Sequence, residues 1–264
     1  MIASTSNQRV KEARKLHERR HRATMGRLLL EGVRLINDAW QSSTQPDVLF
    51  YLPEQINSIP AAAQLLAKLT RARVETVACT PEVFATLTET VTPQGLVAVV
   101  PLPSLPLPQL PTFTLILDQI RDPGNAGTLL RSAEAAGVEL VICAPGTVDL
   151  FNEKVVRAGM GAHFRLPLRT CSQWNEVREL LHPQQQLYLA EASATVAYDQ
   201  VDWSLPVALI IGGEAEGASL EARQLATATT LTIPMHGTVE SLNAAIAGAV
   251  LLFEAARQRR LLRR

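Results

Sequence analysis

A run of prolines near the middle of the chain constrains its fold more than any other feature. Residues 101–111 read PLPSLPLPQLP, with five prolines. Each proline removes a backbone donor and fixes φ, so neither a helix nor a central strand can persist there. We therefore predict that the 264 residues form two domains, over 1–100 and 113–264, joined by a linker over 101–112.

The part before the prolines has the pattern of a small α/β domain. VLFYL, VETVAC and GLVAVV are apolar runs of strand length, and helical patterns lie near residues 60–70 and 81–88. The stretch GRLLLEGVRLINDAW predicts a strand followed by a helix, and residues 7–22 predict one basic helix.

The part after the prolines alternates more clearly. Continuous apolar strands are predicted at 114–118, 139–144, 187–192, 207–212 and 230–234, with helical segments between most of them. This alternation indicates a mostly parallel sheet that is covered by helices on both faces. Ligands of such sheets bind beyond the carboxyl ends of the strands.

The formal net charge of zero hides an uneven distribution. Residues 1–35 hold nine Lys or Arg against three Glu, and residues 254–264 hold five Arg against Glu254. Local fields of this kind attract polyanions such as nucleic acids. A solvated helix face and a frayed basic tail remain the alternative interpretation.

Cysteine spacing and hydropathy narrow the class of protein. Cys79, Cys143 and Cys171 are widely separated, so we expect buried thiols and neither a disulfide framework nor a metal site. The opening MIASTSNQRV lacks the apolar run of a secretory signal, and no window reaches the roughly 18 apolar residues of a membrane span. We expect a cytoplasmic protein without a membrane partner.

The first segment that points to chemistry is DQIRDPGNAGTLLRSAEAAG. Asp122 is placed to cap a helix that Gly137 ends. Asn125, Thr128 and Arg131 point away from its apolar stripe, toward whatever the sheet edge faces. An ordinary surface arginine is the alternative for Arg131. The stripe consists of Ala126, Leu129, Leu130, Ala133 and Ala136.

The second segment is VALIIGGEAEGAS, in which a buried strand runs into a glycine-rich loop before a helix that Ser219 can cap. Glycines permit a sharp bend and the close approach of a ligand. The loop has neither the spacing of G-x-G-x-x-G nor the lysine of a P-loop, so it does not indicate a phosphate site. A turn without a ligand is the alternative.

The third segment, LTIPMHGTVESLNAAIAGAVLLFEAARQRR, predicts a strand, a polar loop and a helix that Ser241 can cap. Helix capping, which does not exclude catalysis, is the alternative interpretation of both Ser241 and Asn243. The helix is apolar nearly all round from Leu242 to Phe253. It is too short to cross a bilayer, so we expect burial on more than one side, with a second subunit as a natural partner.

Taken together and in this order, the three segments resemble the signature motifs of the SpoU/TrmH family of SPOUT methyltransferases. The segment DLFNEKVVRAGMGAHFRLPL is similar to the family's region between the first two motifs. The opening SNQRVKEARKLHERRHRATMGRLLLEGVRLI resembles the start of the family's ribosomal-protein-like RNA-binding domain. Nearly the whole chain is covered.

The resemblance implies an α/β SPOUT domain with a C-terminal trefoil knot. It implies transfer of a methyl group from S-adenosylmethionine to a ribose 2′-hydroxyl of RNA, in a homodimer whose active sites combine both chains. The implied catalytic residues are Asn125, Arg131, Glu214, Ser241 and Asn243. The implied cofactor residues are Gly212, Gly213, Glu214, Gly217, Ile233, Met235, Leu242 and Asn243. RNA is expected to contact Arg9, Lys11, Arg14, Lys15, Arg19, Arg20 and Arg157.

Two residues depart from the family pattern. Ala215 stands where glycine is usual, and Ala218 stands where a larger apolar residue is common. Proposals for the family make the arginine a general base, yet a guanidinium has a pKa above about 12 and stays protonated. We therefore interpret Arg131 as a clamp on the phosphate beside the target ribose.

The sequence leaves alternatives open for the RNA substrate and for the class of protein. A full N-terminal domain favours ribosomal over transfer RNA by family analogy alone. A non-catalytic RNA-binding protein that retains the fold is a second alternative, with Ala215 as its basis. An oxidoreductase is disfavoured because no G-x-G-x-x-G follows a predicted strand.

Overall fold

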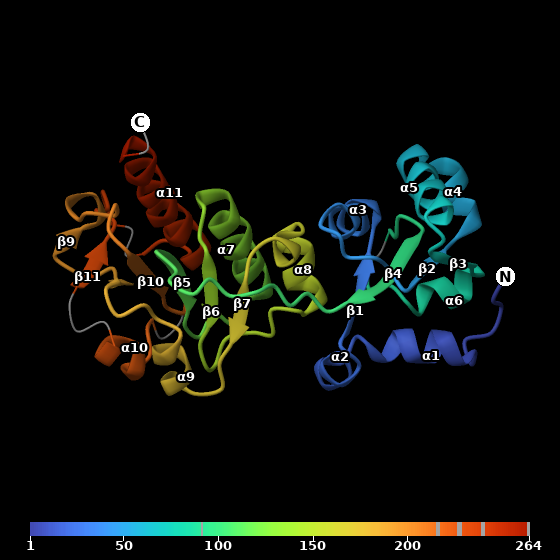
Figure 1. The fold of residues 1–264 in the computed structure, drawn as a ribbon, viewed down its shortest axis with the longest axis horizontal. Helices are drawn as coiled ribbons and strands as arrows, with labels where there is room; N and C mark the ends of the chain where they lie inside the picture. Colours follow the sequence, from blue (N-terminus) through green and yellow to red (C-terminus); the bar gives the residue numbers. More distant parts are fainter. Residues whose placement is uncertain (91, 215–216, 226–228, 239–240, 263–264) are drawn as a thin grey trace. The chain divides into compact units, whose positions relative to one another are not determined.

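The computed structural model describes residues 1–262 except 91, 215–216, 226–228 and 239–240. The chain divides into two compact units (Figure 1). The first comprises Met1–Pro103 together with Phe151–Glu153, and the second comprises Ser104–Leu150 and Lys154–Arg264. The short segment Phe151–Glu153 thus belongs to the first unit, although the residues on both sides of it belong to the second.

The first unit is a four-stranded sheet in the order β1-β4-β2-β3 with helices around it. Strand β4 runs antiparallel to β1 and β2, and β3 runs parallel to β2. The strands are β1 (Arg27–Glu31), β2 (Val48–Tyr51), β3 (Glu75–Ala78) and β4 (Leu96–Pro101). The helices are α1 (Gln8–Lys15), α2 (Arg19–Met25), α3 (Val33–Gln41), α4 (Pro53–Ser58), α5 (Pro60–Arg71) and α6 (Pro81–Ala85). The predicted small α/β domain is confirmed as a fold class.

The prediction of one basic helix over 7–22 is wrong, because the chain breaks between α1 and α2. Arg22 is only 4% exposed, and its Nη1 donates to the carbonyl oxygens of Leu16 and His17, each at 2.7 Å. These carbonyls follow the end of α1 and have no partner within that helix. The guanidinium of Arg22 therefore stabilises the break.

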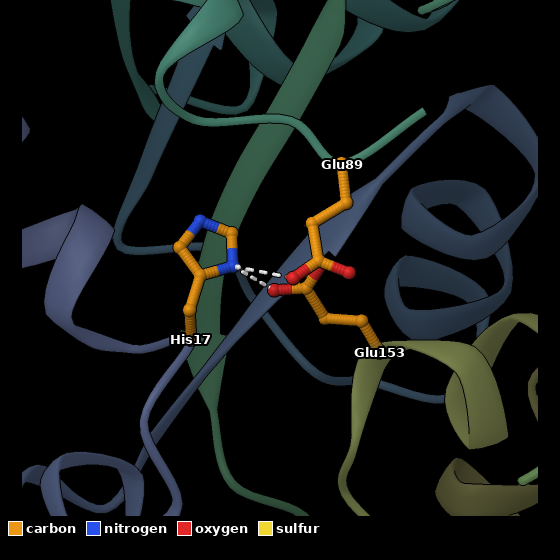
Figure 2. Close-up of side chains that lie close together, drawn as sticks. All are labelled: His17, Glu89 and Glu153. Carbon is orange, nitrogen blue, oxygen red and sulfur yellow. Dashed lines mark hydrogen bonds and ion pairs between the residues drawn. The ribbon is translucent and has the colours of Figure 1, made fainter. Parts of the chain in front are cut away.

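Three side chains meet at the end of this break in the first unit. Figure 2 shows Nδ1 of His17 facing the carboxylates of Glu89 and Glu153. Glu153 forms an ion pair with it, while Oε1 of Glu89 lies 3.9 Å away. The hydrogen bond that the His17 ring donates to Glu153 raises the pKa of His17 above its usual value. Among the described residues this is the one group whose side chains could together bind a metal ion. The ion pair between His17 and Glu153 is sufficient to explain why these side chains lie close together.

The second unit is a seven-stranded sheet in the order β7-β6-β5-β10-β8-β11-β9, with every pairing parallel. The strands are β5 (Phe113–Leu117), β6 (Leu140–Cys143), β7 (Leu168–Thr170), β8 (Gln186–Ala190), β9 (Val196–Ala197), β10 (Val207–Ile211) and β11 (Thr229–Thr232). The helices are α7 (Pro123–Ala136), α8 (Glu153–Gly159), η1 (Ala162–Phe164), α9 (Trp174–Glu179), η2 (Tyr198–Gln200), α10 (Leu220–Leu225) and α11 (Ala244–Leu262). The predicted parallel sheet is confirmed.

Alternate residues of the central strands enter two cores, which shows that both faces of the sheet are covered. Leu209 and Ile211 of β10 pack with residues of α7 and α11, whereas Ala208 and Ile210 pack with residues of α9 and α10. This alternation follows from the two-residue repeat of a strand. Buried strands between two helix layers therefore read as continuous apolar runs.

Helix α7 forms as the sequence predicts. The carboxylate of Asp122 accepts a hydrogen bond from the Asn125 backbone at 2.7 Å, and Gly137 ends the helix with φ +82°. The whole predicted stripe is buried: Ala126, Leu129, Leu130, Ala133 and Ala136. Helix α11 packs closely beside it, since a Cβ at Gly248 would lie 2.3 Å from the Leu129 side chain.

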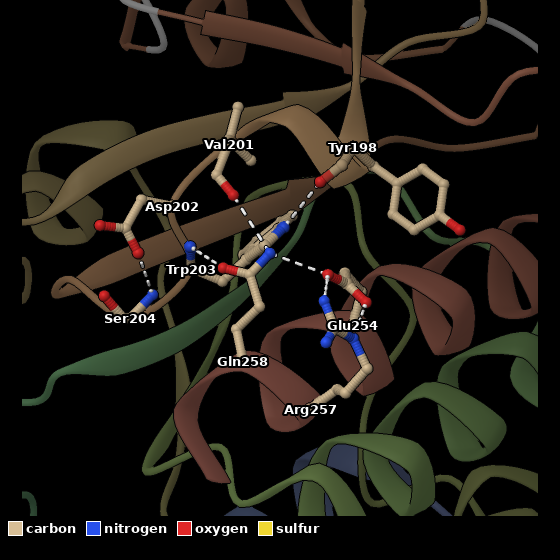
Figure 3. Close-up of polar contacts among 8 residues, drawn as sticks. All are labelled: Tyr198, Val201, Asp202, Trp203, Ser204, Glu254, Arg257 and Gln258. Atoms are coloured by element: carbon tan, nitrogen blue, oxygen red, sulfur yellow. Dashed lines mark hydrogen bonds and ion pairs between the residues drawn. The ribbon is translucent and has the colours of Figure 1, made fainter. Parts of the chain in front are cut away.

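The end of α11 holds the connection between β9 and β10. Figure 3 shows Gln258 between this connection and its own helix. Its Oε1 accepts a hydrogen bond from the Trp203 backbone at 3.0 Å, and its Nε2 donates to the Val201 carbonyl at 3.2 Å. The buried Trp203 ring packs edge-on against Tyr188 of β8. These contacts tie the helix to the edge of the sheet.

Part of the predicted basic tail is structural. Arg257 pairs with Glu254 on the same helix face. Arg259 donates to the carbonyl oxygens of Thr112 and Leu205, at 2.7 and 2.6 Å, and lies over the Phe113 ring at 4.6 Å. These two arginines are therefore engaged within the unit, and the tail offers less free charge than its composition indicates.

The state of the cysteines and the hydropathy of the helices can be compared with what the sequence predicts. Cys79, Cys143 and Cys171 are buried thiols. No described helix combines the length and the apolar character that a membrane span requires. The predicted knot stays a prediction, because the loop after β11 includes residues 239–240, which lie outside the described residues.

Candidate active site

Four loops begin side by side at the carboxyl edge of the second sheet. Strands β5, β10, β8 and β11 are consecutive in the sheet, and Ile211 is level with both Leu117 and Ala190. Leu231 is in turn level with Ala190. Loops far apart in sequence therefore start at one edge, which is where parallel sheets bind ligands.

The loops after β8, β10 and β11, together with the start of α11, enclose a cavity of about 570 Å³. Its volume falls within the range of about 300–1,000 Å³ that is usual for organic ligands. Apolar side chains from β10, β11 and α11 form much of its wall. The lining includes all eight residues implied for the cofactor: Gly212, Gly213, Glu214, Gly217, Ile233, Met235, Leu242 and Asn243.

The glycine loop after β10 needs its glycines because backbone approaches backbone there. A Cβ at Gly212 would lie 2.6 Å from the Ala218 nitrogen, and one at Gly213 would lie 2.5 Å from the Gln119 carbonyl oxygen. The Gly213 N–H donates to the Gly217 carbonyl at 3.1 Å, which closes the loop. The result is a tight wall made largely of main chain.

A buried carboxylate anchors the far end of this loop. Asp118, the residue after β5, accepts a hydrogen bond from the Ser219 backbone at 2.7 Å. Burial raises the pKa of Asp118 above its usual value, while the Ser219 hydrogen bonds lower it. Oγ of Ser219 in turn accepts from the Ala222 N–H at 3.1 Å, so the predicted cap of α10 is confirmed.

One chain of hydrogen bonds joins the three segments that the sequence singles out. Nδ2 of Asn243 donates to Oδ1 of Asn125 at 3.0 Å, and Nδ2 of Asn125 donates to the Glu214 carboxylate. Asn243 also caps α11, since its Oδ1 accepts from the backbones of Ala245 and Ile246. Capping and site formation thus use different atoms of the same side chain.

The prediction that Ser241 caps α11 is wrong, because the helix begins at Ala244 and Asn243 stands directly before it. The exposed Ser241 instead lines the cavity. The departure at Ala215 lies outside the described residues. Ala218 is buried against Gly212 and lines the cavity, where its small side chain fits the close approach of the two backbones.

Arg131 is not brought into this group. It is exposed on α7, six residues after Asn125, and is absent from the described lining of the cavity. No ion pair or hydrogen bond engages its guanidinium within the described residues. It is therefore available to a ligand that approaches α7 from outside the chain.

The basic residues of the first unit divide into engaged and exposed ones. Arg9 forms an ion pair with Glu75, and Arg22 is buried. Five others implied for RNA contact are exposed on α1 and α2: Lys11, Arg14, Lys15, Arg19 and Arg20. Arg157 lies half-buried on α8 of the second unit.

The sequence reasoning missed a polar part of the cavity wall. Glu191, Ser193, Arg223 and Thr232 line it, and Arg223 forms an ion pair with Glu191. Glu191 directly follows the buried strand LYLA, and a carboxyl group at such a position was a usable signal. Its neighbours could not be read in the same way, because the sequence does not reveal which strands flank β8.

The fold and this edge of the sheet define an α/β enzyme that holds an organic ligand between loops. A family model for the SpoU rRNA methylase family matches residues 112–253, and a model for an MRM3-like substrate-binding domain matches residues 7–98. The chain belongs to the SpoU rRNA methylase family.

Individual relatives agree with this assignment. The chain is 33% identical to a 23S rRNA guanosine 2′-O-methyltransferase of Bacillus subtilis, over 96% of this chain and 97% of that one. It superposes on an AdoMet-bound rRNA methyltransferase of Sinorhizobium meliloti with a TM-score of 0.82 and 31% identity, over 97% of each chain. For the AdoMet complex of the SpoU methyltransferase AviRb of Streptomyces viridochromogenes, the TM-score is 0.81 and the identity 31%, over 97% of this chain and 100% of that one.

Proposed function

We propose that this protein is an RNA methyltransferase that transfers a methyl group from S-adenosylmethionine to a ribose 2′-hydroxyl of ribosomal RNA. The observation that carries the proposal is the hydrogen-bonded group of Glu214, Asn125 and Asn243 beside the glycine-walled cavity. The Bacillus subtilis relative, which matches over nearly the whole of both chains, is a 23S rRNA methyltransferase, and two similar structures hold AdoMet.

The residues of the cavity fit S-adenosylmethionine. Ile211, Leu231 and Leu251 offer apolar surface for an adenine ring. Gly212 and Gly213 leave the backbone bare, so main-chain groups can reach a ligand directly. The cofactor would supply a methyl group on a cationic sulfur, which leaves as a neutral thioether while the ribose oxygen gains the methyl and loses its proton.

The side chains of this protein would then position the ribose. Hydrogen bonds fix Asn125, Asn243 and Glu214 relative to one another, so these three side chains are already in place before substrate binds. Alignment of two reacting groups can supply a large part of an enzyme's rate acceleration. Arg131 would clamp the phosphate beside the target ribose through the two parallel donors of its guanidinium.

Incubating the purified protein with methyl-labelled S-adenosylmethionine and unmodified ribosomal RNA tests the proposal. We expect label in ribosomal RNA at a 2′-O-methyl nucleotide that resists alkaline cleavage. Label in transfer RNA alone would replace the proposed substrate. Binding of RNA without binding of the cofactor would replace the enzyme with an RNA-binding adaptor.

The exposed basic residues of α1 provide a first prediction, for RNA affinity. Replacing Lys11, Arg14 and Lys15 together with glutamine should lower the slope of log affinity against log salt concentration by about 2 to 3, because each phosphate contact contributes about 0.7–0.9. Filter binding at several salt concentrations measures this slope.

A matched variant removes three basic residues of the same unit elsewhere, namely Lys68, Arg71 and Arg73, which are exposed at and after the end of α5. Its slope should stay close to that of the unchanged protein. Equal effects of the two triple variants would mean that α1 is not the RNA-binding surface.

We also propose that the protein is a homodimer formed through α11. This helix buries Ala245, Leu251 and Leu252 against its own unit, yet Ile246 is 55% exposed and Phe253 is 50% exposed. The two exposed residues lie seven positions apart, so they share one face. A second copy of the chain can cover this face on both subunits at once through a two-fold axis.

Phe253→Asp should convert this dimer into a monomer, because a charge would be buried without a partner. Light scattering coupled to size exclusion measures the mass. Leu110→Asp is the matched control, since Leu110 is 63% exposed and lies outside α11. A dimeric Phe253→Asp protein would show that another surface forms the interface.

A further inference from the structure

The polar wall that the sequence reasoning missed is centred on Glu191. This residue follows β8, which lies between β10 and β11 in the sheet. Its N–H donates to the Leu231 carbonyl at 2.9 Å, so its backbone is held level with the end of β11. Glu191 therefore sits between the origins of the two loops that carry the implied cofactor residues.

The Glu191 side chain is only 13% exposed, although it carries a carboxylate. Its partner is Arg223 of α10, whose Nη1 forms an ion pair with Oε1 of Glu191 and whose Nε donates to the Ala218 carbonyl at 3.3 Å. The arginine thus holds the carboxylate against the glycine loop. A largely buried carboxylate requires hydrogen-bond donors, because it can only accept.

Apart from Arg223, no side chain of the described residues donates a hydrogen bond to the Glu191 carboxylate. Oγ1 of Thr232 is directed to the Ala192 carbonyl, at 3.2 Å. Ile211, Leu231 and Leu251 supply the apolar part of the cavity wall next to β8, β10 and β11. A ligand bound in the cavity would therefore supply further hydrogen-bond donors to the Glu191 carboxylate.

We propose that Glu191 accepts hydrogen bonds from the ribose hydroxyls of S-adenosylmethionine, as a specificity residue of the methyltransferase proposed above. Two adjacent hydroxyls present two donors, which match the two oxygens of one carboxylate. The α-ammonium of the cofactor is a poorer match, because the guanidinium of Arg223 already neutralises this carboxylate and would repel a second cation.

Calorimetric titration of Glu191→Gln with three ligands tests the proposal without measuring activity. The ligands are S-adenosylhomocysteine, its 2′-deoxyribose analogue, and 5′-methylthioadenosine, which keeps the ribose but has no ammonium group. The unchanged protein should bind S-adenosylhomocysteine about 10- to 100-fold more tightly than the deoxy analogue, as expected for a hydrogen bond to a charged group. Glu191→Gln should lose most of this preference.

The same variant should weaken 5′-methylthioadenosine by about the same factor as S-adenosylhomocysteine. Loss for S-adenosylhomocysteine and its deoxy analogue, with 5′-methylthioadenosine unaffected, would assign the carboxylate to the ammonium and overturn the proposal. Equal loss for all three ligands would overturn it as well, because the carboxylate would then only shape the wall or contact the adenine. Unchanged affinities would have the same consequence.

Two further variants separate binding from folding. Arg223→Gln removes the ion pair but keeps the carboxylate, so the preference for ribose over deoxyribose should persist. Glu179→Gln makes the same chemical change at an exposed position on α9 and should alter none of the affinities. If the unchanged protein bound none of the three ligands, the proposed methyltransferase function would fail, whereas an unaffected Glu191→Gln variant removes only the role of Glu191.

Discussion

Gly213→Ala should abolish most of the affinity for S-adenosylmethionine while the protein remains folded. The added Cβ would lie 2.5 Å from the Gln119 carbonyl oxygen, which is backbone and cannot rotate away. Such overpacking costs about 1–3 kcal/mol. The loop can relieve it only by moving relative to β5, so we expect an affinity loss of about 10- to 100-fold, measured by calorimetry.

Gly137→Ala is the control for this prediction. Gly137 has φ +82° but open space around its Cβ position, so alanine there introduces backbone strain without a clash. It should lower the melting temperature of the protein and leave the affinity for S-adenosylmethionine unchanged. Wild-type affinity in Gly213→Ala would show that the loop after β10 does not form the wall of the cofactor site.

Arg131→Ala should lower kcat by about 100- to 1,000-fold, the usual effect of removing one group that stabilises a transition state. Its affinity for S-adenosylmethionine should not change, because Arg131 does not line the described part of the cavity. Arg131→Lys should recover only part of the rate, since an ammonium cannot make two parallel hydrogen bonds to a phosphate. Single-turnover methylation of RNA measures the rate.

Thr128→Ala is the matched control on the same helix, because Thr128 is exposed and lies between Asn125 and Arg131. It should leave the rate nearly unchanged. Full activity in Arg131→Lys would exclude the bidentate clamp. A large rise in the Kd of S-adenosylmethionine in Arg131→Ala would instead place this arginine at the cofactor.

Mixing the two impaired variants, assayed at an S-adenosylmethionine concentration that does not saturate Gly213→Ala, decides whether the site is shared between subunits. If Arg131 serves the cavity of the partner, a mixed dimer of Gly213→Ala and Arg131→Ala subunits contains one site with neither change. Activity should then return when the variants are refolded or expressed together. If each chain forms its own site, both sites carry a change and no activity returns.

Local patterns predicted those elements whose causes are local. Asp122 and Gly137 bound α7 because a side-chain cap and a left-handed glycine act within a few residues. The strands β5 and β10 were visible because both of their faces are buried. Strands β7 and β9, with three and two residues, are too short to produce a pattern.

Charge was a weaker guide than hydrophobicity, because composition does not show which side chain finds a partner. Arg22 and Arg259 were counted with basic clusters, yet both donate to backbone carbonyls that lie at the ends of segments. This contact of Arg22 stabilises the break between α1 and α2. Lys11, Arg14 and their exposed neighbours on α1 and α2 stay available for the role that composition predicts.

The sequence by itself determined the α/β class of both units, the parallel sheet of the second, the helix that carries Asn125 and Arg131, and the glycine loop at 212–217. These features depend on hydrophobic periodicity, caps and glycine, which act over short stretches of chain. Only the tertiary structure decided that Glu191 lies beside that loop and that Asn243, rather than Ser241, caps α11 and bonds to Asn125. The reason is that the order of parallel strands brings distant loops together, and no local pattern encodes that order.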